Sequence, residues 1–583
     1  MLGRVDGAGK GYSWKDLLPA LLTLAAAPWL AAMLFAAFVG VPHYIPSYLE
    51  FGHMWRAYAG SSHYRLLLDL AVAIPLALTL LIAALPLLSR RPVLFGDAHF
   101  ANEAEVRAAG LRAGQGVILG KLRGRLLRAQ GQLGVLLFAP PRSGKGVGFV
   151  IPNLLAWTGS AIVNDLKLEN FEKTSGARAA MGQGIVLFAP LDPDGRSHAY
   201  NPLDFVSSDP RLRVNDVQAI TAKLVVTPAR ADPMWSNEAR VLLDGLILFL
   251  LDVGDGASLG AIYRMVLSVP NFADYLSWAL KEYDGRLDPV SVMQFNGFLG
   301  KAAKEQSGVL STLKASLSLF ANPLIDRATS TTDFDPRDLR RRRMTIFLGV
   351  MPRDIARLSP LLNIFVQQTV DSLLGRLPGA DEPHQVLALL DEFTALGRLE
   401  NVEKGIAYFA GYNIVLAPVI QDLSQLEEVY GQAVTETFLS TANIRIAYAQ
   451  NSLKTAKYLS EELGFRTIRT RSRSHRIADP WQGHVSESQA RRELMLPHEI
   501  RELDRRKLLL LVEAAPPVKG EKIRYYRDWR FTRLLRPPLE PPRLIPKLIE
   551  PPRMLAPESA LTDQEIDEVL TALDRPGNPH KQE

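Results

Sequence analysis

Two short segments carry residue types that suit phosphate chemistry. The first, Leu136–Pro152, reads LLFAPPRSGKGVGFVIP. A Gly-containing loop between a buried strand and a helix directs backbone amides at phosphate oxygens, and a lysine in the loop adds a point charge. We therefore predict an ATP site in which Lys145 reaches the β and γ oxygens. The predicted binding residues are Pro140, Pro141, Arg142, Ser143, Gly144, Lys145 and Gly146.

The sequence of this loop differs from the usual phosphate-loop motif at two positions. Ala139 stands where Gly is usual, and Gly146 stands where Ser or Thr normally offers a hydroxyl to Mg²⁺. Without that hydroxyl, Mg²⁺ must depend on carboxylates, phosphates and water. A turn that only serves packing is the alternative reading of the loop.

The second segment, Val386–Phe393, reads VLALLDEF, a buried strand followed by two carboxylates. Open α/β sheets bind ligands at the carboxyl ends of their strands. We predict that Asp391 holds Mg²⁺ through water and that Glu392 polarises the attacking water. Gln421 closes another apolar run, Asn413–Gln421, and is predicted to sense the γ-phosphate or orient water, with a plain loop amide as the alternative.

The surrounding pattern predicts an α/β protein with a doubly wound sheet, because short apolar runs alternate with longer amphipathic stretches. Around the phosphate loop we expect a strand over Leu133–Ala139 and a helix over Gly146–Leu155. A further strand, within Ala161–Asn170, ends in Asp165, Lys167 and Glu169. These charges would line the nucleotide or a subunit contact, or they are simply solvated.

Length and composition limit the number of domains, the binding partners and the kinds of cross-link that the chain can have. A chain of 583 residues is too long for one core. Its 67 Lys and Arg against 61 Asp and Glu give a net charge of only +6, so polyanion contacts are expected only where basic residues cluster. The chain has no cysteine, which excludes disulfides and thiolate metal sites.

Two segments near the N-terminus are apolar enough to span a membrane. Residues 17–41 carry no charge, and residues 66–88 carry only Asp69. Each exceeds the about 20 residues that a membrane helix needs. The bias of basic residues places both ends in the cytoplasm. These residues are Arg4, Lys10 and Lys15 before the first segment and Arg90 and Arg91 after the second, against Arg56 and Arg65 between them.

Several motifs in fixed order resemble one family, the type IV coupling proteins, which are membrane-anchored ATPases of bacterial conjugation and type IV secretion. Besides the phosphate loop, the motifs are FGDAHFANEAEVRAAGL (95–111), YNPLDF (200–205), EQSGVLSTL (305–313), ATSTTDFDPRDLR (328–340), LLDEFTALGRL (389–399), QDLSQLEEVYG (421–431) and RRELMLPHEI (491–500). The family also uses the GKG spelling, whereas Pro141 departs from the Thr common in relatives.

The resemblance implies a RecA-like P-loop ATPase domain with an inserted all-α domain, behind two transmembrane helices. The implied segments are a cytoplasmic tail (1–16), the first span (17–41), a periplasmic loop (42–65), the second span (66–88), the RecA-like domain (92–205 and 336–535), the all-α domain (206–335) and a Pro-rich tail (536–583). The protein is then expected in the bacterial inner membrane as a multi-pass protein with its main body in the cytoplasm.

The resemblance also implies the partners. We expect a homo-hexamer in contact with inner-membrane lipid and with type IV secretion channel components. The cargo would be a relaxase bound to single-stranded DNA or secreted effector proteins. A neighbouring subunit would supply an arginine to the γ-phosphate, for which Arg398 and Arg445 are candidates.

The predicted function is a coupling ATPase that recruits substrate to the secretion channel and uses ATP hydrolysis in transfer. One alternative is a DNA-translocating membrane ATPase of chromosome segregation, against which the YNPLDF block and the helical insert argue. The other is a docking receptor that binds nucleotide without significant hydrolysis.

Three segments outside the predicted site also have recognisable patterns. Phe465–Arg476 (FRTIRTRSRSHR) is expected to form a strand or hairpin whose arginines track a phosphate backbone or face solvent. The run Arg340–Arg343 is read as a surface turn. After Arg536 the prolines predict an extended linker that packs as neither helix nor sheet, ending in a short acidic amphipathic helix at Leu561–Asp574 that docks a partner or folds back.

Overall fold

The computed structural model describes residues 14–48, 50–88, 94–227, 232–254, 256–476, 479–544 and 549–553. The predicted helix at 561–574 lies outside these residues. The chain divides into two compact units. One unit comprises Met1–His99 with Gly464–Leu494, and the other comprises Phe100–Leu463 with Met495–Glu583.

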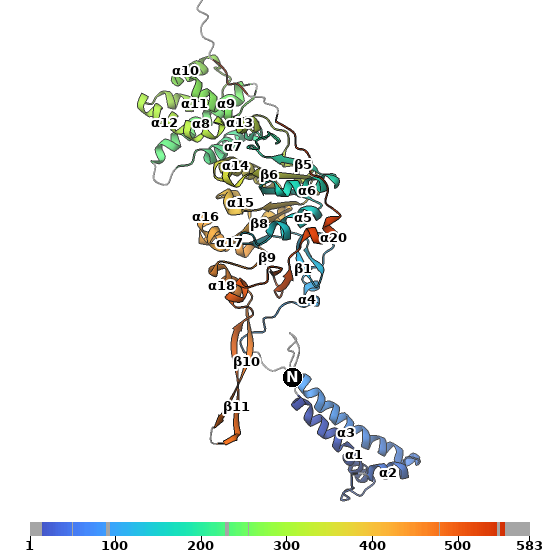
Figure 1. Ribbon diagram of the computed structural model, residues 1–583. Helices are drawn as coiled ribbons and strands as arrows, with labels where there is room; N and C mark the ends of the chain where they lie inside the picture. Colours follow the sequence, from blue (N-terminus) through green and yellow to red (C-terminus); the bar gives the residue numbers. More distant parts are fainter. Residues whose placement is uncertain are drawn as a thin grey trace, which may run out of the picture. The chain divides into compact units, whose positions relative to one another are not determined.

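The first unit holds two long apolar helices, α1 (Trp14–Phe38) and α3 (Ser62–Leu88), joined through α2 (Glu50–Tyr58). Their segments Leu18–Phe38 and Ser62–Ala84 are long and apolar enough to cross a membrane. The two helices pack along each other (Figure 1). Large side chains such as Leu22 and Leu80, 63% and 71% exposed, face away from this contact, as expected for helices surrounded by lipid.

The same unit contains a two-stranded antiparallel ribbon, β10 (Phe465–Arg476) and β11 (Asp479–Glu493). The strand predicted over Phe465–Arg476 is therefore confirmed. Arg466 also forms an antiparallel bridge with Asp97. The side chains of residues 471–487 lie outside the described part, so the use of the remaining arginines stays a prediction.

The second unit is built on an eleven-stranded sheet of order β2-β1-β13-β12-β9-β3-β8-β7-β4-β6-β5. Neighbours are parallel from β9 to β5 and antiparallel from β9 to β2. The strands are β1 (Val117–Leu122), β2 (Arg125–Ala129), β3 (Val135–Phe138), β4 (Ser160–Leu166), β5 (Gly184–Phe188), β6 (Met344–Val350), β7 (Val386–Leu390), β8 (Ile414–Ile420), β9 (Ile444–Ala447), β12 (Lys507–Val512) and β13 (Val518–Glu521).

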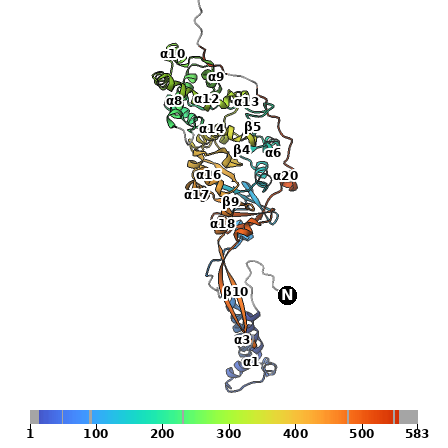
Figure 2. The same cartoon turned by 60° about the vertical axis from the view of Figure 1, so that its left-hand side comes forward.

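Helices cover both faces of this sheet, which is why its parallel strands are continuous apolar runs. Helices α5, α6 and α20 lie on one side and α14 to α17 on the other (Figures 1 and 2). The bounds are α4 (Glu103–Ala108), α5 (Ile151–Ala156), α6 (Glu169–Ala180), α14 (Ile355–Leu374), α15 (Glu400–Gly405), α16 (Leu423–Tyr430), α17 (Gln432–Thr441), α18 (Leu453–Glu462), α19 (Pro497–Arg501) and α20 (Trp529–Thr532). The predicted doubly wound α/β fold is confirmed.

Between β5 and β6 the chain forms a helical cluster (green in Figure 1). Four of its helices start with an Asp or Asn cap followed by proline, a pair that accepts an orphan amide and presets the first helical φ. The capping residues are Asp209, Asp232, Asp288 and Asn322. The helices are α7 (Pro210–Leu224), α8 (Pro233–Val253), α9 (Leu259–Ser268), α10 (Phe272–Glu282), α11 (Pro289–Leu299), α12 (Ala303–Ser316) and α13 (Pro323–Ala328).

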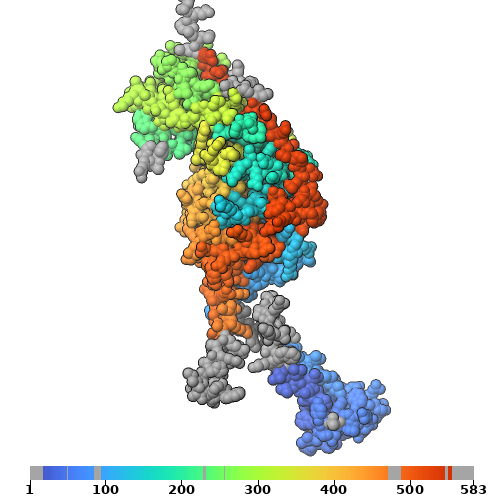
Figure 3. All heavy atoms as spheres, viewed as in Figure 1, coloured from blue at the N-terminus to red at the C-terminus, as the bar shows by residue number. Residues whose placement is uncertain are grey.

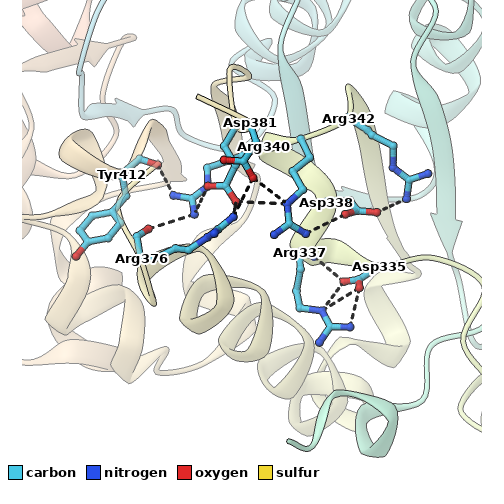
Figure 4. Close-up of polar contacts among 10 residues, drawn as sticks. Asp335, Arg337, Asp338, Arg340, Arg342, Arg376, Asp381 and Tyr412 are labelled. Atoms are coloured by element: carbon cyan, nitrogen blue, oxygen red, sulfur yellow. Dashed lines mark hydrogen bonds and ion pairs between the residues drawn. The ribbon is translucent and has the colours of Figure 1, made fainter. Parts of the chain in front are cut away.

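The reading of Arg340–Arg343 as a surface turn is wrong for its first residue. Arg340 is only 1% exposed. Its Nη2 lies 2.8 Å from Glu382 Oε2, and its guanidinium donates to the carbonyls of Tyr412 and Arg376, both at 3.2 Å (Figure 4). A single buried cation thus ties together the segments that precede β6, β7 and β8.

The Pro-rich segment is extended, as predicted, but it packs on the body. Arg543 forms an antiparallel bridge with Arg196, in the loop that follows β5. The expectation that this segment packs as neither helix nor sheet is therefore wrong at that point. A proline can accept hydrogen bonds through its carbonyl, and the carbonyl of Pro542 accepts from Ser197 N–H at 3.0 Å.

We predict that Arg340→Met lowers the thermal midpoint of the detergent-solubilised chain. The substitution removes the cation that pairs with the buried Glu382 carboxylate and the donor to two partly buried carbonyls, at a cost of about 3 kcal/mol. Arg342→Met is the matched control, because the Arg342 side chain is 71% exposed and its pairing with Asp338 contributes about 0–1 kcal/mol. Equal midpoints for the two variants would contradict the structural role of Arg340.

Candidate functional site

The predicted phosphate loop lies between β3 and a π-helical turn, Gly146–Val150, that continues into α5. Ser143 N–H donates to the carbonyl of Pro140 at 3.1 Å, which closes a four-residue turn. Pro141 holds the second position of this turn, where its fixed φ is favourable, and Arg142 holds the third with φ +59°. Pro141 is thus compatible with the geometry of the loop.

Lys145 is the centre of the site. Its Nζ lies 2.7 Å from Asp391 Oδ1 and 2.5 Å from Glu392 Oε1. The two carboxylates follow β7, and Lys145 follows β3, with β8 between these strands. Parallel strands end at one edge of the sheet, which explains why residues far apart in sequence meet here.

Gln421 joins the same cluster from the end of β8. Its Nε2 donates to Glu392 Oε2 at 2.8 Å, and its Oε1 accepts from Gln425 Nε2 at 3.2 Å. The structure therefore brings together all four side chains predicted to be catalytic. The alternative prediction for Gln421 was an amide in a loop with no particular contacts. Hydrogen bonds to Glu392 and Gln425 do not fit that alternative.

The two carboxyls have different electrostatic environments. Burial raises the pKa of Asp391 above its ordinary value, against the lowering effect of Lys145. Burial also acts to raise the pKa of Glu392, but hydrogen bonds from Lys145 and Gln421 outweigh it and hold that pKa below its ordinary value. Glu392 is thereby kept as an ionised acceptor.

The loops that carry the site residues contain strained backbone conformations. Seven non-glycine residues have positive φ in the described part of the chain, and four of them are Arg142, Lys167, Leu168 and Glu392. These four follow β3, β4 and β7, at the edge that holds Lys145. Left-handed non-glycine residues persist only where surrounding structure holds them, and they concentrate at functional sites.

The charges after β4 separate into two environments. Asp165 is fully buried and accepts the amides of Asn170 at 3.0 Å and Phe171 at 2.7 Å, at the start of α6. The reading of a solvated charge is therefore wrong for Asp165. Lys167 and Glu169 are exposed, and the positive charge of Lys167 acts on Glu392.

Three further residues at this edge were not found from the sequence. Asn164 Nδ2 donates to the carbonyl of Asp391 at 2.6 Å. Lys522 Nζ donates to the carbonyl of Ser143 at 3.0 Å and lies 3.8 Å from the centre of the Tyr448 ring. Burial lowers the pKa of Lys522 to about 8. Lys522 follows β13 in the antiparallel part of the sheet, and none of the sequence motifs indicated it.

The candidate trans-acting arginines are engaged within the chain. Arg398 pairs with Glu403 at 2.9 Å, and its side chain is 53% exposed. Arg445 pairs with Glu462 at 2.7 Å and donates to Tyr458 Oη at 2.6 Å. The exposed position of Arg398 suits a residue that reaches another subunit better than the half-buried position of Arg445.

Comparison with known proteins shows the family of the chain. Residues 99–551 match the family described as Type IV secretory system Conjugative DNA transfer. VirD4 of Agrobacterium fabrum is 34% identical over 476 residues, covering 80% of this chain and 71% of that protein. The conjugal transfer protein TraG of Escherichia coli is 30% identical over 515 residues, covering 78% of this chain and 80% of that protein.

Solved structures show the same fold. The bacterial conjugative coupling protein TrwBdeltaN70, in its unbound monoclinic form, has a TM-score of 0.56 at 17% identity and covers 74% of this chain and 93% of its own. TrwB in complex with the ATP analogue ADPNP has a TM-score of 0.55 at 16% identity, covering 75% and 95%.

Fold and site together define an α/β protein with the fold of TrwB, in which a glycine-containing loop and a carboxylate pair meet at one sheet edge. The chain belongs to the type IV coupling protein family, the coupling proteins of type IV secretion and conjugation. The family predicted from the ordered motifs is therefore confirmed.

We predict that Gly146→Ser is tolerated at the unusual position of the loop. A Cβ at Gly146 would meet no heavy atom within 4 Å, and serine suits a helical turn better than glycine by about 0.5 kcal/mol. The thermal midpoint should stay equal or rise. Gly148→Ser is the matched control and should lower it, because a Cβ there would lie 2.8 Å from Tyr448 Oη. A destabilised Gly146→Ser chain would show that the glycine is a steric requirement.

We predict that Asp165 makes stability depend on pH. Burial, opposed by the two amides, raises its pKa to about 7, whereas an aspartate in an unfolded chain titrates near about 3.9. The folded chain binds the extra proton between these values, so its free energy of unfolding falls as pH rises from about 4 through about 7.

Asp165→Asn removes this titration. The difference in thermal midpoint between about pH 6 and about pH 8 should therefore be smaller in the variant than in the original chain. An unchanged difference would show that Asp165 does not titrate in this range.

Proposed function

We propose that this coupling protein hydrolyses ATP and uses the hydrolysis to move substrate into the secretion channel. The observation that carries the proposal is the contact of Lys145 with both Asp391 and Glu392, at 2.7 and 2.5 Å. A phosphate-binding lysine, a metal-holding carboxylate and a water-polarising carboxylate are the three groups that phosphoanhydride hydrolysis needs.

The residues present fit nucleotide and Mg²⁺. Ser143 Oγ and Asn164 Oδ1 are buried at this edge without a hydrogen-bond partner among the described residues, so each has capacity for a ligand or its water. Mg²⁺ usually binds one or two carboxylates and completes its shell with phosphate oxygens and water, which suits Asp391 as its holder. The TrwB complexes with ADPNP and with ADP and Mg²⁺ support the same ligands for this chain.

Each side chain then has a defined role. Lys145 moves from the carboxylates to the β and γ oxygens, and Glu392, released from Lys145, accepts a hydrogen bond from the attacking water. Gln421 keeps Glu392 oriented during this exchange through its hydrogen bond to Oε2. Mg²⁺, when bound, would neutralise charge that develops on the phosphate oxygens.

Membership of the family supports a proposal for the larger assembly. We propose a homo-hexamer in the bacterial inner membrane, crossed by α1 and α3, with the second unit in the cytoplasm. A neighbouring subunit would supply an arginine to the γ-phosphate, and Arg398 is the better candidate because its side chain is half exposed. Secretion channel components and inner-membrane lipid are its surroundings, and relaxase-bound single-stranded DNA or effector proteins are its cargo.

We expect Lys145→Ala and Asp391→Ala to abolish ATP hydrolysis and substrate transfer, because each removes a group that contacts nucleotide or its metal. Both variants should still insert into the membrane, since neither substitution touches α1 or α3. Hydrolysis by the purified full chain and transfer in cells are the two measurements.

Glu392→Gln separates the ATPase from a docking receptor. The amide has a similar shape but cannot take up a proton, so this variant should bind ATP while hydrolysing it at least about 100-fold more slowly. Unchanged transfer by Glu392→Gln, or transfer by Lys145→Ala at the original rate, would contradict the proposal.

A further inference from the structure

The described part of the Pro-rich tail is held by the sheet domain at several main-chain positions. Leu539 N–H donates to Ser175 Oγ on α6 at 3.1 Å. The bridge between Arg543 and Arg196 is flanked by hydrogen bonds from Ser197 N–H to Pro542 O at 3.0 Å and from Leu544 N–H to Gly195 O at 2.9 Å. Figure 3 shows the tail in red along the teal surface of this domain. The tail is therefore a bound segment of the body.

The next described residues, Ile549–Arg553, lie on the all-α cluster. Arg264 Nη2 donates to the carbonyl of Ile549 at 2.5 Å, and Tyr275 Oη donates to the carbonyl of Pro552 at 2.7 Å. Gly256 leaves room for the Ile549 side chain, because a Cβ at Gly256 would lie 3.3 Å from Ile549 Cδ1. Two side-chain donors thus hold two main-chain acceptors of the tail.

The chemistry of this contact is selective for proline-containing peptides. Pro551 and Pro552 have no N–H, so this stretch of extended chain offers mainly acceptors, and both donors come from the domain. Arg264 is fixed by an ion pair with the buried Asp326. Donors that are positioned by the fold lose little freedom when they bind a peptide.

The contact borders a cavity of about 750 Å³. Its lining is mainly apolar and aromatic, and it includes the tail itself. The apolar and aromatic lining includes Met265, Val269, Pro270, Tyr275, Phe320 and Pro552. An aromatic and apolar groove with a few fixed donors is the usual form of a site for proline-rich segments.

We propose that this groove of the all-α cluster is a binding site for an extended, proline-containing peptide, and that its resident ligand is the chain's own Ile549–Arg553. The all-α cluster is joined to the sheet domain by the chain at its two ends, after β5 and before β6. The tail then adds a third, non-covalent connection between the two. The inference does not depend on ATP hydrolysis and stands or falls on peptide binding.

The test uses the full chain in detergent and a fluorescent peptide that copies residues 549–556. The original chain should bind the peptide poorly, because its own tail fills the groove at high effective concentration. A tail variant, Ile549→Asp with Pro551→Gly and Pro552→Gly, should bind it at least about 10-fold more tightly, as measured by anisotropy. Equal binding by the two chains, or no binding by the tail variant, would overturn the proposal.

A matched pair of tyrosine variants locates the site. Tyr275→Phe in the tail variant should weaken peptide binding about 5-fold, since it removes one hydrogen bond. Tyr283→Phe, which alters a ring packed on Phe249 in the same cluster, should leave binding unchanged. Equal effects of the two substitutions would contradict the assignment.

A second readout needs no peptide. In the otherwise original chain, Tyr275→Phe should speed trypsin cleavage after Arg553 several-fold relative to Tyr283→Phe, because it loosens the tail. Equal cleavage rates would also count against the resident ligand.

Discussion

The site depends on one interaction, the sharing of the Lys145 ammonium between Asp391 and Glu392. Two adjacent carboxylates at a half-buried sheet edge repel each other, and a cation between them offsets that repulsion. The sequence supplies this cation from another strand, so β3 and β7 must end at the same level on either side of β8. The contact between Lys145 and the two carboxylates therefore requires this order of strands.

In the proposed mechanism, the same interaction would let the site respond to nucleotide. Phosphate oxygens would compete with the carboxylates for Lys145, and a lysine that moved toward phosphate would leave Glu392 free to accept a hydrogen bond from water. The left-handed backbone at Glu392 and the turn at Pro141 and Arg142 fix the two loops on either side of this contact. The missing hydroxyl at Gly146 would then change how metal is held, and the proposed movement of Lys145 does not require it.

The four side chains predicted to be catalytic could be found from the sequence because each lies just after the end of a strand. Lys145, Asp391, Glu392 and Gln421 each follow an apolar run, and parallel strands bring such residues to one edge. Lys522 was not predictable, since it reaches the phosphate loop from the antiparallel part of the sheet through long-range pairing. The surface-turn prediction was wrong for Arg340 because its burial depends on two carbonyls and a carboxylate from two other segments of the chain. The prolines of the tail predicted its extended form, but the carbonyl acceptors that bind it to the body have no sequence signature.

A structure of the chain with a non-hydrolysable ATP analogue and Mg²⁺ would show where Lys145 lies when nucleotide is bound. We expect Lys145 Nζ to leave Asp391 and Glu392 and to contact the β and γ oxygens, while Gln421 keeps its hydrogen bond to Glu392. A bound nucleotide with Lys145 still paired to both carboxylates, at the present 2.7 and 2.5 Å, would contradict this expectation.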